Sequence, residues 1–226
     1  MKLVRVLTVA GSDSCGGAGI QADLKTITAL GGFGMSVITA VTAQNTSGVQ
    51  GICEVSPHFV KKQFEAVVKD IGVDAVKTGM LGSAEILKAV AGMLRKYKIK
   101  KVVVDPVLAA KGGEALIRGK ARETLIAELI PLALVVTPNV PEAELLSGIK
   151  ITSETEMKKA AEVIHGLGAK NVVIKGGHLK DDATDILYDG RKFRKFYSRR
   201  IDRKDVHGTG CIFSSALATL IARGNG

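Results

Sequence analysis

Long apolar segments are missing from this sequence: no run approaches the length that a helix needs to span a bilayer. No signal peptide is visible either, because Met1 and Lys2 lead directly into a strand-like stretch. We therefore expect a cytoplasmic protein that does not contact a membrane.

Cysteine is scarce as well. The three cysteines, Cys15, Cys53 and Cys211, are widely spaced and form no CxxC pair. This pattern indicates neither a disulfide framework nor a structural zinc site, so we expect reduced thiols. Of the 226 residues, 46% are hydrophobic, which is enough for one sizeable core. We predict a single domain over residues 1–226.

Negative charge is in short supply: 32 lysines and arginines face 22 carboxylates, giving a formal net charge of +10. The densest basic run is interrupted by aromatic residues, which makes nucleic-acid binding conceivable. We favour instead an edge hairpin that turns at Asp189-Gly190 and carries its apolar residues on the inner face, because edge strands are commonly lined with charge. We therefore expect no nucleic-acid partner. The run comprises Arg191, Lys192, Arg194, Lys195, Arg199, Arg200, Arg203 and Lys204.

Short β-branched runs alternate along the chain with longer amphipathic stretches. This alternation predicts an α/β fold in which crossover helices connect parallel strands. Several predicted strands are apolar on both faces, as expected when helices cover both sides of a sheet. We predict a three-layer α/β/α sandwich with a mostly parallel central sheet and an antiparallel edge hairpin. Predicted strands cover residues 3–9, 35–41, 74–77, 101–105, 132–137 and 171–175, and predicted helices cover residues 18–30, 57–71, 83–97, 119–129, 153–167 and 212–221.

Small and polar residues follow the predicted strands. In sheets of this kind ligands bind beyond the carboxyl ends of the strands. Six neighbouring segments rich in glycine or small polar residues therefore indicate one assembled site. They are residues 11–13, 42–45, 78–80, 105–107, 137–139 and 176–178.

Two glycine-rich loops precede predicted helices. The first, residues 14–19, resembles a phosphate cradle, because glycines let backbone N–H groups approach an anion. A tight turn without a ligand is an equally good interpretation. The second runs from Gly208 to Cys211, and its N–H groups, with the helix dipole, could stabilise a transferring phosphoryl group.

Cys211 lies in the first turn of the helix that follows the second loop. We expect this position to lower its thiol pKa, which makes Cys211 a candidate base for a substrate hydroxyl. The alternative is a small buried cysteine that only packs the helix. We predict Gly208, Thr209, Gly210 and Cys211 as the reaction centre.

Six segments, in this order, carry a specific resemblance: AGSDSCGGAGIQAD at residues 10–23, TAQNT at 42–46, KTGML at 77–81, DPV at 105–107, TPN at 137–139 and HGTGC at 207–211. Together they resemble the hydroxymethylpyrimidine/phosphomethylpyrimidine kinases of thiamine biosynthesis, which have the ribokinase-like fold. The resemblance runs from Val6 to Ala222 and agrees with the alternation described above.

The resemblance implies two successive ATP-dependent phosphorylations, of 4-amino-5-hydroxymethyl-2-methylpyrimidine and then of its monophosphate. It also implies that Gly11, Asp23, Gln44, Met80 and Val107 bind the substrate. The amide of Gln44 suits this role, because it offers one acceptor and two donors to the edge of an aminopyrimidine. For each of these residues, packing or capping is the ordinary alternative.

On the nucleotide side, Asn139 and Glu142 resemble the NxxE motif of the superfamily, which implies a role in organising Mg²⁺ and phosphates. Asp105 is a second candidate metal residue, since magnesium prefers oxygen ligands and retained waters. Lys175 and Thr209 are expected to bind the nucleotide. Glu142 could instead be a first-turn carboxylate favoured by its helix dipole, and Lys175 could be merely solvated.

Two features depart from the family pattern. Residues 201–205 lack the threonine that commonly follows the aspartate there, so Arg203 or Lys204 could contact phosphate instead. Family members also usually continue beyond the Cys211 helix, so we expect a shortened kinase domain.

Two alternatives to the pyrimidine kinase function are pyridoxal kinase activity, alone or in addition, and a pyrimidine-binding module that has lost catalysis. The resemblance also suggests a homodimer.

Overall fold

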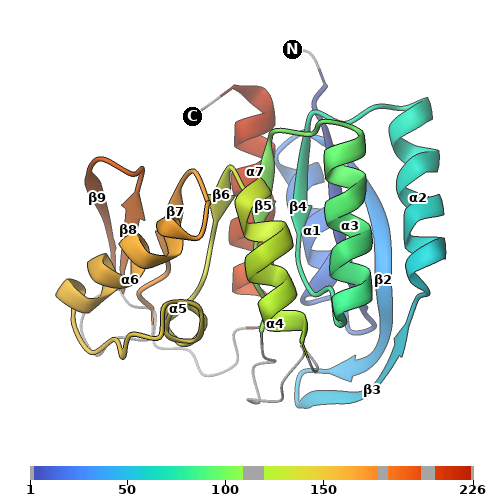
Figure 1. Ribbon diagram of the computed structural model, residues 1–226. Coiled ribbons are helices and arrows are strands. Elements are labelled where there is room, and N and C mark those ends of the chain that lie inside the picture. The colour runs from blue at the N-terminus through green and yellow to red at the C-terminus, as the bar shows by residue number, and fades with distance from the viewer. Residues whose placement is uncertain (1–2, 109–119, 178–182, 200–206, 225–226) are drawn as a thin grey trace.

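The structure is a computed structural model, which describes residues 3–108, 120–177, 183–199 and 207–224. The described strands form one sheet in the order β3-β2-β1-β4-β5-β6-β7-β8-β9 (Figure 1). They are β1 (Arg5–Asp13), β2 (Phe33–Asn45), β3 (Gly48–Glu54), β4 (Ala75–Thr78), β5 (Val102–Val104), β6 (Val135–Val136), β7 (Val172–Ile174), β8 (Ala183–Tyr188) and β9 (Phe193–Ser198). The α-helices are α1 (Gly19–Ala29), α2 (Pro57–Asp70), α3 (Ala84–Lys96), α4 (Ala121–Thr124), α5 (Val140–Ser147), α6 (Glu154–Gly166) and α7 (Thr209–Arg223).

The middle of the sheet is parallel and its edges are antiparallel. Strands β2, β1, β4, β5, β6 and β7 run in the same direction. At one edge β3 pairs antiparallel with β2, and at the other β8 and β9 reverse direction in turn. The predicted mostly parallel sheet is therefore confirmed.

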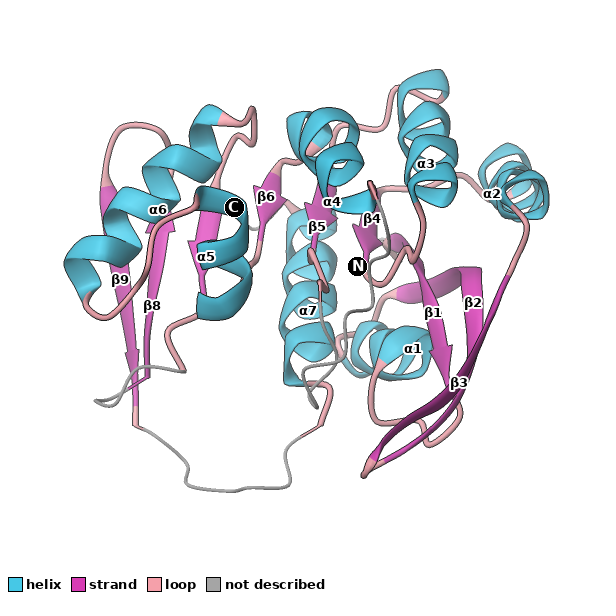
Figure 2. Ribbon diagram, turned by 60° about the horizontal axis from the view of Figure 1, so that its bottom comes forward, coloured by secondary structure: helices cyan, strands magenta, loops and turns pink. Residues whose placement is uncertain are grey.

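Helices cover the sheet from two sides (Figure 2). Helices α1 and α7 pack on one face against β1, β4 and β5, whereas α2, α3, α4 and α6 lie on the other. Val102, Val103 and Val104 of β5 are consequently fully buried, as predicted for a strand that is covered on both faces. This arrangement confirms the α/β/α sandwich. Among the described helices, none is long and apolar enough to cross a membrane.

The edge at β2 and β3 was not predicted. The sequence suggests a loop at residues 42–45, but these residues extend β2 and pair with β3. Asn45 ends the strand, and its Oδ1 accepts hydrogen bonds from the N–H groups of Ser47 and Gly48, which closes the turn. The side chain of Gln44 is thereby fixed on a strand rather than on a loop.

The edge hairpin of β8 and β9 is confirmed, but its predicted inner face is only partly right. Phe193 stacks on Tyr188 with ring centroids 4.5 Å apart. Phe196 and Tyr197 are exposed, because no described helix covers this part of β9. Lys195 forms an ion pair with Glu154 of α6. Arg200, Arg203 and Lys204 of the basic run lie outside the described residues, as does the segment 201–205.

The helices near the site also differ in detail from the prediction. The predicted helix over residues 119–129 is the short α4 followed by a π-helical turn, Leu125–Leu129, while residue 119 lies outside the described residues. Helix α5 was not among the predicted helices. Its start is fixed by Asn139 and its end by Gly148, which has a left-handed φ of 73°.

Candidate active site

A cavity of about 520 Å³ lies at the carboxyl ends of the parallel strands. This is where ligands bind in open α/β sheets. The predicted site residues come together here from strands and loops that are distant in sequence. Twelve of them line the cavity: Gly11, Gln44, Met80, Asp105, Val107, Asn139, Glu142, Lys175, Gly208, Thr209, Gly210 and Cys211.

Asp23 is the predicted site residue that does not line the cavity. Its carboxylate is fully buried and accepts hydrogen bonds from Lys77 Nζ at 2.7 and 2.9 Å and from Thr8 Oγ1 at 2.6 Å. Lys77 itself lines the cavity. Asp23 is therefore placed to act on the cavity through Lys77.

The Lys77 ammonium is also fully buried. Burial alone would lower its pKa, but nearby negative charge, that of Cys211 when its thiol is ionised and that of Asp23, outweighs burial and raises the pKa of Lys77. Burial raises the pKa of Asp23, whereas the contact with Lys77 lowers it. Since both oxygens of Asp23 accept from the same Nζ, we describe the pair as a carboxylate and an ammonium. The cavity thus has a fixed positive charge in its wall.

Cys211 stands in the first turn of α7, but the expected lowering of its pKa is wrong. Burial raises the pKa of the Cys211 thiol, and the carboxylates of Asp23 and Asp105 raise it further. Lys77 and the N–H of Gly19 oppose this shift without overcoming it. The side chain is half-buried in the cavity wall, and the direction of this shift favours the thiol over the thiolate.

The two glycine-rich loops touch each other beside Cys211. Gly208 has a φ of 77°, and a Cβ at this position would lie 1.8 Å from the carbonyl oxygen of Gly17. At Gly17, a Cβ would lie 2.7 Å from Cδ2 of His207. Only glycine permits this approach of one backbone to the other. The contact brings the start of α1 next to the start of α7.

The first loop binds a carboxylate of its own chain. Asp13 Oδ2 accepts hydrogen bonds from the N–H groups of Gly17 and Ala18 at 3.1 and 2.8 Å, and Oδ1 accepts from the N–H of Cys15. Burial would raise the pKa of Asp13, but these bonds and the one with His207 lower it. The N–H groups that suggested a phosphate cradle are therefore engaged by Asp13.

Lys175 and Asp105 form a second pair in the cavity wall. Lys175 Nζ lies 3.1 Å from Asp105 Oδ1. The carboxylate of Asp105 also accepts hydrogen bonds from Thr137 Oγ1 and Ser214 Oγ at 3.3 and 3.2 Å. A Cβ at Gly210 would lie 3.3 Å from Lys175 Nζ, so the second glycine loop passes directly over this pair.

Asn139 and Glu142 form a capping box at the start of α5. Asn139 Oδ1 accepts from the N–H of Glu142, and Glu142 Oε2 accepts from the N–H of Asn139, both at 2.9 Å. Burial and then the charge of Asp105 raise the pKa of Glu142, whereas Lys175 lowers it. The capping role considered from the sequence is thus present, and both side chains also line the cavity.

A divalent cation fits this end of the cavity. Asp105 and Glu142 present carboxylate oxygens to it, and oxygen is the donor that Mg²⁺ prefers. Both carboxylates already accept hydrogen bonds within the protein. This donor set suits an ion held partly through its retained waters.

The sequence assigned no role to three ionisable residues that line the cavity: Asp13, Lys77 and His207. Gln44 Nε2 and His207 Nε2 lie 3.1 Å apart, which links this histidine to a predicted substrate residue. A signal for Lys77 does exist in the sequence, since it is a lysine within the buried strand Ala75–Thr78. A charge in such a strand requires a partner.

Val107 has a φ of 23°, in the region that favours glycine. A β-branched residue in this conformation is strained, and strained residues cluster at ligand sites. The position of Val107 in the cavity wall is consistent with that tendency.

Residues 13–226 match the phosphomethylpyrimidine kinase family. The chain is 49% identical to the hydroxymethylpyrimidine/phosphomethylpyrimidine kinase of Bacillus subtilis, over 100% of this chain and 84% of that protein. It is 58% identical to a thiamine biosynthesis bifunctional protein of Geobacter sulfurreducens, over 97% of this chain but 45% of that protein. The chain thus spans less than half of the bifunctional relative.

Solved structures agree with this similarity. The crystal structure of phosphomethylpyrimidine kinase from Clostridium difficile superposes with a TM-score of 0.87 at 48% identity, covering 98% of this chain and 91% of that one. The ADP complex of Bacillus subtilis pyridoxal kinase superposes with a TM-score of 0.92 at 40% identity, covering 99% and 85%. The family expected from the six segments is therefore confirmed: the chain belongs to the phosphomethylpyrimidine kinase family.

Proposed function

We propose that this chain transfers a phosphoryl group from ATP to the hydroxymethyl oxygen of 4-amino-5-hydroxymethyl-2-methylpyrimidine, and a second one to the resulting monophosphate. The observation that carries the proposal is the convergence of twelve predicted site residues on one cavity. Family membership supports the same reaction, since the relatives are named for it.

Gln44, Met80, Val107 and Gly11 form the acceptor side of the cavity. In this proposal the amide of Gln44 binds the amino group and ring nitrogen of the pyrimidine, while Met80 and Val107 provide apolar contacts; the lining of the cavity by all three supports these roles. A Cβ at Gly11 would lie 3.4 Å from Met80 Sδ, so glycine keeps this wall open. The role of Asp23 is indirect, because its carboxylate holds the Lys77 ammonium in place.

The reaction centre is the start of α7. The N–H groups of Gly208, Thr209 and Gly210 and the positive end of the helix stabilise charge on the transferring phosphoryl group. Cys211, as the thiolate, accepts the hydroxyl proton of the substrate. Lys77 and the N–H of Gly19 favour this thiolate, although burial opposes it. Phosphoryl transfer depends mainly on alignment and charge neutralisation, which this arrangement provides.

Lys175, Asn139 and Thr209 form the nucleotide side. The Lys175 ammonium binds phosphate oxygens of ATP, and Asp105 and Glu142 would hold Mg²⁺, since both carboxylates line this part of the cavity. Bound Mg²⁺ neutralises phosphate charge during transfer. From the family resemblance we also propose a cytoplasmic homodimer, without nucleic-acid or membrane partners.

Pyridoxal is a second candidate substrate. The observation in its favour is the TM-score of 0.92 with a pyridoxal kinase. Gln44 and Met80 favour the aminopyrimidine as the preferred substrate, so pyridoxal should be phosphorylated more slowly.

A coupled assay of ATP turnover tests these roles. The hydroxymethylpyrimidine, its monophosphate and pyridoxal are offered to the wild type, to Cys211→Ala and to Cys53→Ala, whose side chain is exposed on β3. We expect turnover of both pyrimidines and a loss of at least about 10²-fold in Cys211→Ala, the lower end of what a positioned acid–base group contributes. Cys53→Ala should match the wild type.

Three results would contradict the proposal. Unchanged turnover in Cys211→Ala would remove Cys211 from the mechanism. Turnover of pyridoxal alone would assign the chain to the alternative substrate. Calorimetric binding of the pyrimidine without any binding of ATP would indicate a pyrimidine-binding module that has lost catalysis.

A further inference from the structure

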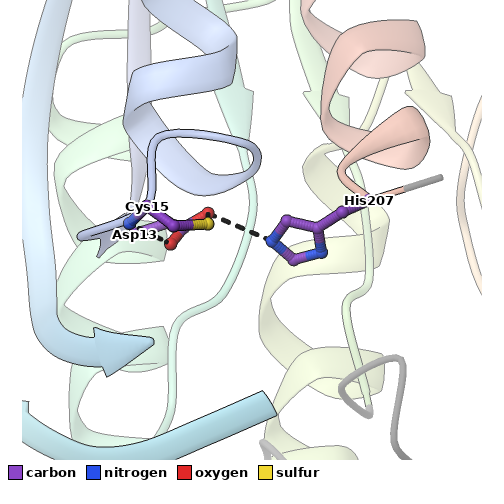
Figure 3. Close-up of side chains that lie close together, drawn as sticks. All are labelled: Asp13, Cys15 and His207. Carbon is purple, nitrogen blue, oxygen red and sulfur yellow. Dashed lines mark hydrogen bonds and ion pairs between the residues drawn. The ribbon is translucent and has the colours of Figure 1, made fainter. Parts of the chain in front are cut away.

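Asp13, Cys15 and His207 form a cluster at the contact between the two glycine loops (Figure 3). Asp13 Oδ2 lies 3.1 Å from His207 Nε2 and 3.3 Å from Cys15 Sγ. The three ligand atoms all lie within 4.8 Å of one another. Carboxylate, thiolate and imidazole are the three side-chain groups that most often bind zinc in proteins.

The spacing of these atoms is close to that of a tetrahedral site. With metal–oxygen and metal–nitrogen distances near 2.0 Å and a metal–sulfur distance near 2.3 Å, tetrahedral ligands lie about 3.3 Å (O to N) and about 3.5 Å (O to S) apart. The observed distances from Asp13 Oδ2, 3.1 Å to His207 Nε2 and 3.3 Å to Cys15 Sγ, are both slightly shorter than these tetrahedral values. Small side-chain movements are therefore enough to admit an ion.

The protein also holds the central ligand in advance. Asp13 is 2% exposed, and the N–H groups of Cys15, Gly17 and Ala18 fix its carboxylate. Such supporting hydrogen bonds orient a metal ligand. Cys15 is exposed, so an ion can enter from solvent on that side.

We propose that Asp13 Oδ2, Cys15 Sγ and His207 Nε2 bind a zinc-class divalent cation, with a water molecule at the fourth position. Without the ion, the S–H of Cys15 and the Nε2–H of His207 both donate to Asp13 Oδ2. On binding, the thiol proton is released to solvent and the ion takes its place. The Nε2 proton of His207 also leaves, and the neutral ring carries its proton on Nδ1 by exchange with solvent, because Nε2 must offer its lone pair to the ion.

Sequence spacing alone does not indicate this site, because Asp13 and His207 are 194 residues apart. A bound ion would tie the loop before α1 to the loop before α7. It would also occupy the atom of His207 that lies 3.1 Å from Gln44 Nε2. Asp13 and His207 both line the cavity, so the ion would sit in the wall of the proposed kinase site.

Cobalt spectroscopy tests the site, because thiolate coordination of Co²⁺ produces a charge-transfer band in the near ultraviolet. The full chain is titrated with Co²⁺ alone, without nucleotide, and then with Zn²⁺. We expect one Co²⁺ per chain with this band, and displacement by Zn²⁺, which does not absorb. Mg²⁺ in excess should not displace either ion, because it prefers oxygen ligands.

The chain offers a matched control for the thiol. Cys15→Ser should lose the band and bind Zn²⁺ at least about 10-fold more weakly, since even loss of a supporting partner weakens metal sites by about 10- to 100-fold. Cys53→Ser, which removes another exposed cysteine, should behave as the wild type. His207→Gln should weaken binding in the same way as Cys15→Ser.

The proposal is overturned if the wild type shows no charge-transfer band, or if Cys15→Ser retains the band and the affinity of the wild type. Should Cys15→Ser fail to fold, the Cys53→Ser variant provides a second route: alkylation of its Cys15 in the folded chain should abolish the band. Persistence of the band after alkylation would equally overturn the site. Both measurements use metal binding alone, so they do not depend on the kinase reaction.

Discussion

The cavity has two aspartate–lysine pairs, which differ in depth. In the Asp23–Lys77 pair both side chains are 0% exposed, and the ions are 2.7 Å apart. In the Asp105–Lys175 pair the lysine is 17% exposed and the separation is 3.1 Å. Both members of the deep pair are enclosed by protein, and only Lys77 of the two borders the cavity. The shallow pair can exchange its partner for a ligand more easily.

Glycine brings the backbone close to both lysines. A Cβ at Gly79 would lie 2.9 Å from Lys77 Nζ, and a Cβ at Gly210 would lie 3.3 Å from Lys175 Nζ. Each ammonium is thus covered by backbone rather than by a side chain. The difference in burial is consistent with the two proposed roles, in which Lys77 provides a fixed charge and Lys175 binds a phosphate of ATP.

The largest expected effect is the loss of stability when the deep pair is broken. Asp23→Ala leaves the Lys77 ammonium buried without its carboxylate, which should lower the free energy of unfolding by about 3–5 kcal/mol. Urea denaturation followed by circular dichroism measures the change. A loss below about 1 kcal/mol would show that Lys77 finds another partner or loses its proton, and the picture of a fixed charge would be wrong.

The double variant Asp23→Leu/Lys77→Met provides the control for this effect. Replacing both ions by apolar side chains removes the unpaired charge, so most of the lost stability should return. Kinase turnover should not return, because the cavity wall then lacks its ammonium. Recovery of both stability and turnover would mean that the deep pair has only a structural role.

In the shallow pair, a substitution should affect ATP affinity more than it affects stability. Lys175→Met removes charge-assisted hydrogen bonds to phosphate worth about 1.5–3 kcal/mol, so ATP should bind about 10- to 100-fold more weakly. Stability should fall less than in Asp23→Ala, because Asp105 keeps its bonds from Thr137 and Ser214. Calorimetric titration with ATP measures the affinity.

Lys150→Met is the matched control for Lys175→Met. Lys150 pairs with Glu144 at the surface, where its side chain is 81% exposed. Exposed pairs contribute little, so neither stability nor ATP affinity should change measurably. If Lys175→Met resembled this control in ATP affinity, Lys175 would not belong to the nucleotide side.

The contrast between the pairs also shows what the sequence can predict. Val102 to Val104 could be recognised as a buried strand, because an apolar run is a local pattern. The cavity residues could be collected because the carboxyl ends of parallel strands meet at one edge. Lys175 and Asp105 were found in this way, since each follows its strand.

Features that depend on distant partners were not predictable in the same way. The partner of Lys77 is 54 residues away, so nothing in its own strand reveals the pair. Strand β3 contains two glycines and, among the described strands, pairs with β2 alone, which conceals it from a local pattern. The pKa of Cys211 was predicted from its place on a helix, whereas burial by other elements determines its direction. Local position and tertiary surroundings can therefore shift the pKa of a side chain in opposite directions.

The smallest expected effect concerns this thiol next to the deep pair. Because burial raises the pKa of Cys211, the folded protein keeps the thiol proton at a pH where the unfolded chain loses it. The resulting contribution to stability is complete below the unfolded pKa of about 8.5 and declines as the pH rises above it. At pH 9.5 the decline is at most about 1.4 kcal/mol, the limit set by ionisation of the unfolded chain alone.

Urea denaturation at pH 7.5 and 9.5 should therefore show a smaller loss of stability with pH in Cys211→Ala than in the wild type. Cys53→Ala should follow the wild type, since that side chain is exposed in the folded chain as well. A steeper decline in Cys211→Ala than in the wild type would mean that Lys77 outweighs burial and that Cys211 is already a thiolate in the folded chain without substrate.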